Sequence, residues 1–220
     1  MNKIFLMIIL LSIAVNAQSS DDELVNPKDL IPDIVIDLRY STADHVFRNL
    51  PSGDIALPKF YTCNESLMLN KLVKALKLAQ DSLRNIRTYN SKNYPSGIGI
   101  KIWDGYRPRA VQYLLFDVYP NPVYIADPTS GSMHNRGGAV DLTLVDLATG
   151  DELEMPTLFD DFSSNSSHTN MNLSQEVINN RQLLKDVLTK VAGLKYYESE
   201  WWHYNLSDAS SYPLMDFQMK

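Results

Sequence analysis

The fold and the chemistry of this chain centre on residues 132–141, which read SMHNRGGAVD. This stretch places His134 and Asp141 seven residues apart, with Gly137 and Gly138 between them to let the backbone turn. Imidazole nitrogen and carboxylate oxygen both bind a borderline divalent ion such as Zn2+. A catalytic zinc site has three protein ligands and one open position. The stretch therefore predicts two metal ligands and requires a third from another part of the chain.

The same stretch runs into an expected strand. Residues 139–145 read AVDLTLV, an alternation that predicts a strand with Asp141 on the face opposite the aliphatic residues. Residues 98–103 (IGIKIW) alternate in the same way, and the β-branched residues 33–40 (DIVIDLRY) indicate a further strand. We therefore expect Asp141 to be held by a rigid sheet.

Two segments carry apolar residues at intervals of three and four, which is typical of amphipathic helices. They cover residues 64–83 and 176–191, and Gly193 stands where the second helix is expected to end. A shorter helix is expected over residues 110–119, because Pro108 suits a first turn and another proline follows its end.

Strands and helices are intermixed along the chain, and long irregular segments separate them, notably residues 41–62 and 151–173. The pattern predicts an α+β fold in which helices flank a small, mainly antiparallel sheet, with long irregular loops around a single metal site. With 220 residues, of which 45% are hydrophobic, the chain suits one domain with a sizeable core.

The beginning of the chain differs from the rest. Lys3 precedes an apolar run of about 12 to 14 residues that ends in small residues, which is typical of a secretory signal peptide over residues 1–17. The alternative is a transmembrane anchor, which needs about 20 apolar residues. We expect a loosely packed leader over residues 18–32 and a catalytic domain over residues 33–220. The mature protein would be exported, to the periplasm or beyond the cell, without stable insertion in a membrane.

Charge and cysteine content exclude some classes of protein. The net charge of −6 makes nucleic acid and anionic membrane surfaces poor partners. Cys63 is the only cysteine, so an internal disulfide is excluded. Because no histidine is near Cys63 in the sequence, a structural or incidental thiol is favoured over a nucleophile. Nothing in the sequence fixes the oligomeric state.

The third ligand is expected near the C-terminus, where residues 200–203 read EWWH. Glu200 and His203 flank two tryptophans, whose apolar bulk would raise the pKa of the Glu200 carboxyl. A glutamate beside a metal-bound water is the usual general base of metal-assisted hydrolysis. On a regular strand the two residues would point to opposite faces, so we expect a bulge or turn between them. The alternative is an aromatic core strand that ends in exposed glutamate and histidine side chains.

Arg107 belongs to residues 104–108, which read DGYRP and join the expected strand to the expected helix. A side chain at such a junction is positioned by the strand and remains reachable, so it commonly carries function. On position alone, the alternative is a salt-bridged arginine on the surface.

Taken together, the motifs resemble one known family. Residues 104–108, 132–141 and 200–203, in this order and spacing, resemble the zinc D-alanyl-D-alanine dipeptidases of the vancomycin-resistance type. The likeness covers most of the mature chain, from residues 37–40 (DLRY) onward, and includes residues 159–160 (FD). The resemblance implies a metallopeptidase that acts on short D-amino-acid peptides.

Carried over to this sequence, the resemblance implies one zinc ion per chain, bound by His134, Asp141 and His203. Glu200 would act as general base and acid. Arg107 would face the scissile carbonyl and stabilise the oxyanion, because a positioned charge in a water-poor site is the largest expected catalytic contribution.

The resemblance further implies that Asp160 recognises the free amino group of the substrate and that Ser132 assists it. The expected activity is zinc-dependent hydrolysis of D-alanyl-D-alanine to free D-alanine, in cell-wall peptide turnover or scavenging. One alternative is a D,D-carboxypeptidase that acts on longer peptidoglycan stem peptides. Another is a non-catalytic, zinc-containing module that binds the cell wall. Glu200 and Arg107 argue against the module, because a structural zinc site needs neither.

Overall fold

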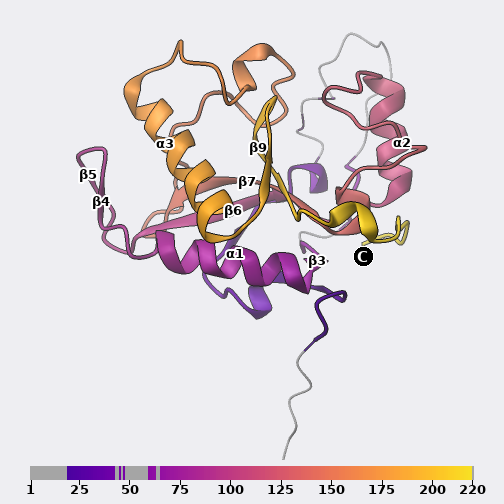
Figure 1. The fold of residues 1–220 in the computed structure, drawn as a ribbon, viewed down its shortest axis with the longest axis horizontal. Coiled ribbons are helices and arrows are strands. Elements are labelled where there is room, and N and C mark those ends of the chain that lie inside the picture. Colours follow the sequence, from indigo (N-terminus) through magenta and orange to yellow (C-terminus); the bar gives the residue numbers. More distant parts are fainter. Residues whose placement is uncertain (1–18, 43–44, 46, 48–58, 63–64, 220) are drawn as a thin grey trace, which may run out of the picture.

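A computed structural model describes residues 19–42, 45, 47, 59–62 and 65–219 of the protein (Figure 1). The expected signal peptide, Cys63 and most of the irregular segment 41–62 lie outside these ranges. Within them, every helix is too short or too polar to span a bilayer.

The main sheet has five strands in the order β2-β6-β7-β9-β8. Their bounds are Val35–Ile36 for β2, Ile98–Asp104 for β6, Ala139–Asp146 for β7, Glu200–Asn205 for β9 and Lys195–Tyr197 for β8. Strand β2 runs parallel to β6, and every other neighbouring pair is antiparallel. This confirms the predicted small, mainly antiparallel sheet of an α+β fold.

The segment before the sheet packs more closely than we expected. Strand β1 (Leu24–Val25) pairs with β3 (Met68–Leu69), and the Asn70 side-chain amide donates to the carbonyl groups of Ser19 and Ser20. Ile31 is only 1% exposed. The expectation of loose packing over residues 18–32 is therefore wrong, because apolar residues of this segment complete the core. The domain boundary after residue 32 stays a prediction.

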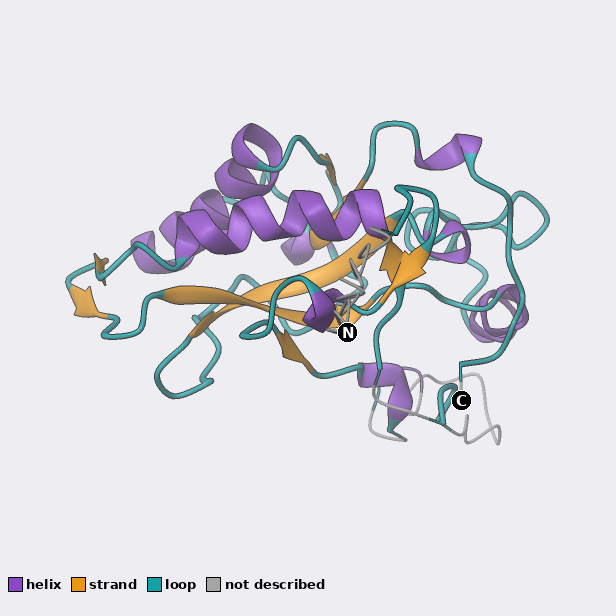
Figure 2. Ribbon diagram, turned by 90° about the horizontal axis from the view of Figure 1, so that it is seen from below, coloured by secondary structure: helices purple, strands orange, loops and turns teal. Residues whose placement is uncertain are grey.

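Helix α1 (Asn70–Leu83) contacts β6 and lies along one face of the sheet, as Figure 2 shows. It begins later than the predicted residue 64, because the pairing of β3 with β1 holds Met68 and Leu69 in extended conformation. The predicted apolar face is buried. Leu72 and Leu76 are fully buried, whereas Leu78 is 55% exposed.

Two other helices match the predicted ones closely. Helix α2 covers Arg109–Val118, and α3 covers Gln175–Asp186 before continuing as a π-helical turn, Val187–Val191. Gly193 follows with a φ of 70°, a left-handed conformation that glycine adopts without strain. Helix α3 contacts β7, so helices flank the sheet as expected.

The remaining elements are short. Strands β4 (Thr88–Tyr89) and β5 (Lys92–Asn93) form a separate hairpin. Among the described residues, 3-10 turns cover Pro27–Asp29, Arg39–Ser41, His134–Arg136, Ser164–Ser166 and Ala209–Ser211. The turn at Arg39 ends the predicted strand 33–40 early, so only its first half pairs with β6.

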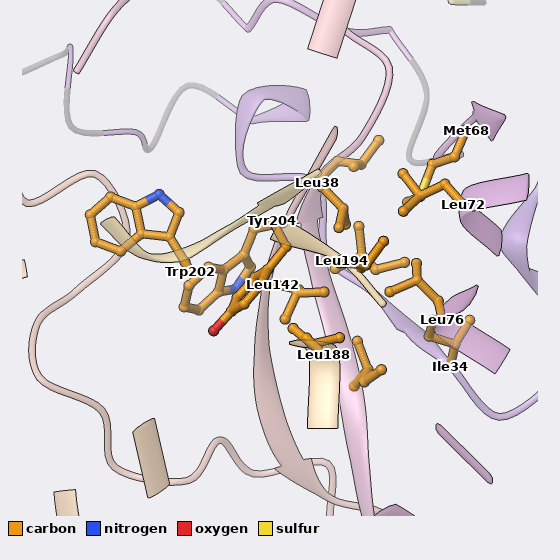
Figure 3. Packing of buried hydrophobic residues seen from close by; sticks show 14 of the residues in the cluster. Ile34, Leu38, Met68, Leu72, Leu76, Leu142, Leu188, Leu194, Trp202 and Tyr204 are labelled. Carbon is orange, nitrogen blue, oxygen red and sulfur yellow. The ribbon is translucent and has the colours of Figure 1, made fainter. Parts of the chain in front are cut away.

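The hydrophobic core lies between the sheet and the helices (Figure 3). Leu142 of β7 and Tyr204 of β9 are fully buried, together with Leu76 of α1 and Leu188 of the π-helical turn. Burying a large apolar side chain contributes about 1.5–3 kcal/mol. The two central strands are therefore fixed in position, and with them the polar side chains at their ends.

Candidate metal centre and catalytic cavity

Three side chains from three elements meet beside the sheet. His134 lies in the 3-10 turn that precedes β7, Asp141 lies on β7 and His203 lies on β9. The pairing of β7 with β9 places Asp141 directly opposite His203. One candidate ligand atom from each residue lies within 4.8 Å of the other two. The two sequence stretches therefore meet, and the three predicted ligands come together.

The hydrogen bonds of His134 fix which ring nitrogen faces the centre. Its Nδ1 lies 2.7 Å from the carbonyl oxygen of Gly105, which can only accept, so Nδ1 carries the proton and Nε2 presents a lone pair. Nε2 lies 3.2 Å from His203 Nδ1 and 3.3 Å from Asp141 Oδ2. The other Asp141 oxygen, Oδ1, lies 2.9 Å from His203 Nδ1. A backbone carbonyl on the far nitrogen is a usual support of a metal-binding imidazole.

These separations suit a metal ion. Ligand atoms at about 2.0–2.1 Å from a tetrahedral ion lie about 3.3 Å from one another, close to the 3.2 and 3.3 Å between these donors. Burial alone would raise the pKa of Asp141, but the charges and hydrogen bonds of His134 and His203 outweigh it and lower that pKa. The carboxylate is therefore ionised. Two imidazoles and one carboxylate form a donor set that fits a divalent metal ion.

Glu200 lies at the start of β9, with its Oε2 3.9 Å from His203 Nδ1. Strand β9 is continuous here, but its register against β8 shifts, since Tyr196 pairs with Tyr204 while Tyr197 pairs with Glu200. The irregularity falls where we predicted it and brings both side chains to the same side. Glu200 is only 7% exposed, so the alternative of an exposed glutamate is wrong.

The surroundings of Glu200 favour its protonated form. Burial, followed by the negative charges of Asp141 and Asp160, raises the pKa of Glu200 well above its ordinary value. A carboxyl group with a raised pKa can both accept and donate a proton near neutral pH, which is what acid–base chemistry requires. The sequence predicted this direction from the adjacent tryptophans.

Arg107 is buried rather than a surface residue, so that alternative is wrong. Its Nε and Nη2 donate to Asp104 Oδ2 at 2.9 and 2.7 Å, and its Nη1 donates to Gln112 Oε1 at 3.0 Å. The guanidinium carbon lies 5.2 Å from the centre of the Tyr40 ring. The guanidinium also interacts with the Tyr61 hydroxyl, and its Nη2 lies 3.8 Å from Asp141 Oδ2. Arg107 lines the cavity and can therefore contact a ligand.

The two residues expected to contact substrate, Asp160 and Ser132, both line the same cavity. Asp160 has a φ of 57°, and its Oδ2 accepts a 2.7 Å hydrogen bond from the Tyr40 hydroxyl. Burial, and then the nearby Asp141, raises the pKa of Asp160 to about 8. The Ser132 hydroxyl accepts from the backbone N–H of His134 at 3.2 Å, so it steadies the metal-binding turn.

All of these side chains line one cavity of about 280 Å³. Its walls include the predicted residues His134, Asp141, His203, Glu200, Arg107, Asp160 and Ser132. The walls also include residues that were not singled out from the sequence, among them Tyr40, Gln112 and Tyr197. Gln112 stands five residues after Arg107, in the expected helix, and no sequence pattern marked it as a contact of Arg107. Tyr197 reaches the cavity from the end of β8, and Tyr40 belongs to residues 37–40, which the family resemblance includes without implying a role for Tyr40.

Comparison with known proteins adds independent information. A family model described as D-ala-D-ala dipeptidase matches residues 20–219. The D-alanyl-D-alanine dipeptidase of Escherichia coli (strain K12) is 32% identical over 197 residues, covering 90% of this chain and 91% of that protein. The D-alanyl-D-alanine dipeptidase of Enterococcus faecium is 33% identical over 175 residues, covering 69% of this chain and 82% of that protein.

One solved structure is also similar. It is the vancomycin resistance D,D-dipeptidase VanXYg in complex with a D-Ala-D-Ala phosphinate analog, at 19% identity and a TM-score of 0.32. The match covers 71% of this chain and about half of the solved chain, 54%. The match to the family model, by contrast, spans the whole sheet and every wall residue of the cavity. The chain is therefore an enzyme, and it belongs to the D-Ala-D-Ala dipeptidase family of metallopeptidases.

Proposed function

We propose that this protein hydrolyses D-alanyl-D-alanine to two molecules of D-alanine, using one zinc ion held by His134, Asp141 and His203. The observation that carries the proposal is the convergence of these ligands with Glu200 and Arg107 on one cavity. A bound zinc ion would supply Lewis acidity, which acidifies water and polarises a carbonyl group. The relatives named above support the dipeptide as substrate.

Glu200 is proposed to move the proton of the reaction. Its carboxylate would take a proton from the attacking water and later give it to the amine that leaves. The raised pKa of Glu200 supports uptake of the proton, because burial and the neighbouring carboxylates favour the protonated form. Burial at 7% exposure keeps bulk water from competing for that proton.

Arg107 is proposed to stabilise the charge that develops on the carbonyl oxygen. Its guanidinium lines the cavity and would donate to that oxygen, while Asp104 and Gln112 keep the guanidinium from rotating. A hydrogen bond to a developing charge is stronger in a buried site than in water, because little solvent screens it.

Asp160 is proposed to bind the free ammonium group of the dipeptide. Without a cation nearby, burial favours the neutral form of the Asp160 carboxyl group and raises its pKa to about 8. An incoming ammonium group would supply the missing countercharge, and the Tyr40 hydroxyl already orients one carboxylate oxygen. The cavity of about 280 Å³ is at the lower end of ligand pockets, which suits a small substrate.

The test is release of D-alanine from D-Ala-D-Ala by the purified mature chain, with and without a zinc chelator. Chelation should abolish turnover, and added zinc should restore it. Glu200→Gln should lower kcat by about 10² to 10⁴-fold, because the general base is lost. Turnover by Glu200→Gln at the wild-type rate would contradict the proposed mechanism. A zinc-loaded wild-type protein that hydrolyses neither dipeptides nor longer wall peptides would point to the non-catalytic binding module.

The D,D-carboxypeptidase remains the second candidate because of a second cavity beside Asp160. Asp160 also lines a second, larger cavity of about 1070 Å³, bounded mainly by residues 152–163. A longer peptide could extend past Asp160 into it. Comparing D-Ala-D-Ala with its N-acetylated form separates the two functions, since a dipeptidase requires the free amine and a carboxypeptidase does not.

We further propose that the protein is exported and acts in wall-peptide turnover or in scavenging free dipeptide. The apolar, basic start of the sequence supports export. Cell fractionation and N-terminal sequencing of the mature protein would test it. Export predicts a mature N-terminus near Gln18 in the periplasm or medium, and a cytoplasmic chain that begins at Met1 would contradict it.

A further inference from the structure

The turn that carries Arg107 and the turn that carries His134 are tied together by contacts outside the catalytic group. The backbone N–H of Arg107 donates to the carbonyl oxygen of His134 at 3.1 Å. The Asn135 side chain, which is fully buried, donates from Nδ2 to the Arg107 carbonyl at 2.8 Å. Its Oδ1 accepts from the backbone N–H of Ser132, also at 2.8 Å. Asn135 therefore links both turns through one side chain.

Residues 212–219, here called the strap, cross the same two turns. The Met215 N–H donates to the Asn135 carbonyl at 2.9 Å, and the Met215 carbonyl accepts from the N–H of Arg109 at 3.2 Å. In Figure 1 this yellow segment runs beside the base of α2. A single strap residue thus joins the metal-binding turn to the helix that begins just after Arg107.

The strap also caps α2. Pro108 precedes this helix and provides no side-chain cap, but Asp216 Oδ1 accepts from the N–H of Ala110 at 2.7 Å. A carboxylate at this end also interacts favourably with the helix dipole. The next strap residue, Phe217, stacks on Tyr106 with ring centres 4.5 Å apart, and its carbonyl accepts from the Tyr106 hydroxyl at 2.9 Å.

These strap residues lie away from the chemistry. Asp216 is exposed, Phe217 is 46% exposed, and neither they nor Met215 lines the catalytic cavity. They can influence a reaction only through the position of the two turns. A displacement of about 1 Å at a catalytic group can cost about 100-fold in rate, so this position matters.

We propose that Asn135, Met215 and Asp216 are positioning residues that set the distance between the Arg107 guanidinium and the metal-binding turn. The inference rests on the proposed function, in which Arg107 stabilises charge in the transition state. Loosening the strap should therefore lower turnover while the metal stays bound, because β7 and β9 hold Asp141 and His203 and the Gly105 carbonyl holds the His134 ring.

The first experiment compares Asp216→Ala, Asn135→Asp and a chain ending at Leu214 with the wild type. We expect kcat on D-Ala-D-Ala to fall at least 10-fold in each, with KM less affected and zinc content per chain unchanged. Gln218→Ala is the matched control, because Gln218 is an exposed strap residue without a hydrogen bond in the described structure. Unchanged kcat in the shortened chain, or zinc lost in parallel with activity, would overturn the inference.

A double-mutant cycle shows whether the strap acts through Arg107. In an Arg107→Ala background, Asp216→Ala should lower kcat by less than 2-fold, because the group it positions is already gone. A loss as large as in the wild-type background would overturn the inference, since a general loosening of the fold acts in both backgrounds.

An activity-independent measurement separates this inference from the proposed function. Amide hydrogen exchange of Arg107 should accelerate in the chain ending at Leu214, while amides in the middle of β6 stay protected. An Arg107 amide as protected as in the wild type would overturn the positioning role. Absence of turnover by the wild-type protein would instead overturn the proposed function. The hydrogen-exchange result would still test whether the strap positions Arg107.

Discussion

Single residues in this enzyme acquire their properties from burial and from one or two neighbours. Asp160 illustrates this, because its carboxyl group is 5% exposed and its pKa is raised to about 8. Its neighbour Asp161 is more exposed and lines only the second cavity. Two identical side chains in sequence therefore differ in chemistry, and the difference can be tested directly.

Asp160→Asn should raise KM for D-Ala-D-Ala by about 10-fold or more, because a charge-assisted contact to an ammonium contributes about 1.5–3 kcal/mol. The variant should discriminate less between the free and the N-acetylated dipeptide. Steady-state kinetics on both substrates measure this, with Asp161→Asn as the matched control. Equal effects of the two substitutions would contradict the assignment of Asp160.

His168 shows the opposite behaviour of a buried base. It is 8% exposed, and neither ring nitrogen has a hydrogen-bond partner among the described residues. Burial, and then the charges of Lys185 and Arg181, lowers the pKa of His168 from 6.5 to about 3. The folded protein therefore holds this histidine neutral where the unfolded chain would protonate it.

This histidine should make the fold sensitive to acid. Below pH 6.5, His168 binds a proton in the unfolded chain but stays neutral in the folded protein. The free energy of unfolding should therefore fall as pH drops from 6.5 towards 3. Above pH 6.5 the contribution is fully present. Denaturant titrations of the chelated protein at several pH values should show a shallower acid decline for His168→Phe. Identical declines in wild type and variant would rule this explanation out.

At the scale of elements, periodicity predicted α2 and α3 to within a residue at their starts, but it misplaced two other boundaries. The apolar spacing that predicted a helix from residue 64 continues through Met68 and Leu69, which instead pair with β1. The strand expected over residues 33–40 was likewise shortened, because the 3-10 turn at Arg39 directs Tyr40 towards the cavity. Both boundaries depend on partners far away in the sequence.

Helix α1 offers a direct test of which face supports the fold. Leu76→Ala should lower the free energy of unfolding by about 2–5 kcal/mol, because it leaves a cavity against β6. Leu78→Ala removes the same atoms from a side chain that is 55% exposed, so it should change stability by less than about 1 kcal/mol. Thermal and denaturant unfolding of the two variants measure the difference. Similar losses of stability in the two variants would contradict the assignment of Leu76 to the buried face of α1 and Leu78 to its exposed face.

At the scale of the whole molecule, the sheet assembles a site whose parts the sequence could indicate only separately. The ligands and Glu200 were predictable because their local motifs carry metal-binding residue types and together, in order and spacing, resemble a known family. Tyr40 was not assigned a role, because its contact with Asp160 joins residues 120 positions apart and arises from tertiary packing. Asp104 and Gln112 lie three and five residues from Arg107, but only the structure shows that they bind its guanidinium.

Metal binding should stabilise the whole fold. Because the three ligands converge only in the folded state, a bound ion adds about 2.7 kcal/mol when its free concentration is 100 times its Kd. Chelation should therefore lower Tm, and zinc should restore it. His134→Ala should show little response to either treatment. A Tm that is equally insensitive in the wild type would argue against a metal at these residues.

The pairing of β7 with β9 has a consequence for how the protein matures. Asp141 and His203 are far apart in the sequence, and loop-closure entropy makes such non-local pairings slow to form. A slip of one residue would turn the side chains of β9 to the other face of the sheet and separate His203 from Asp141. Misregistered chains would therefore lack a complete ligand set. The rate of metal uptake during refolding would then report how fast β7 and β9 pair in the correct register.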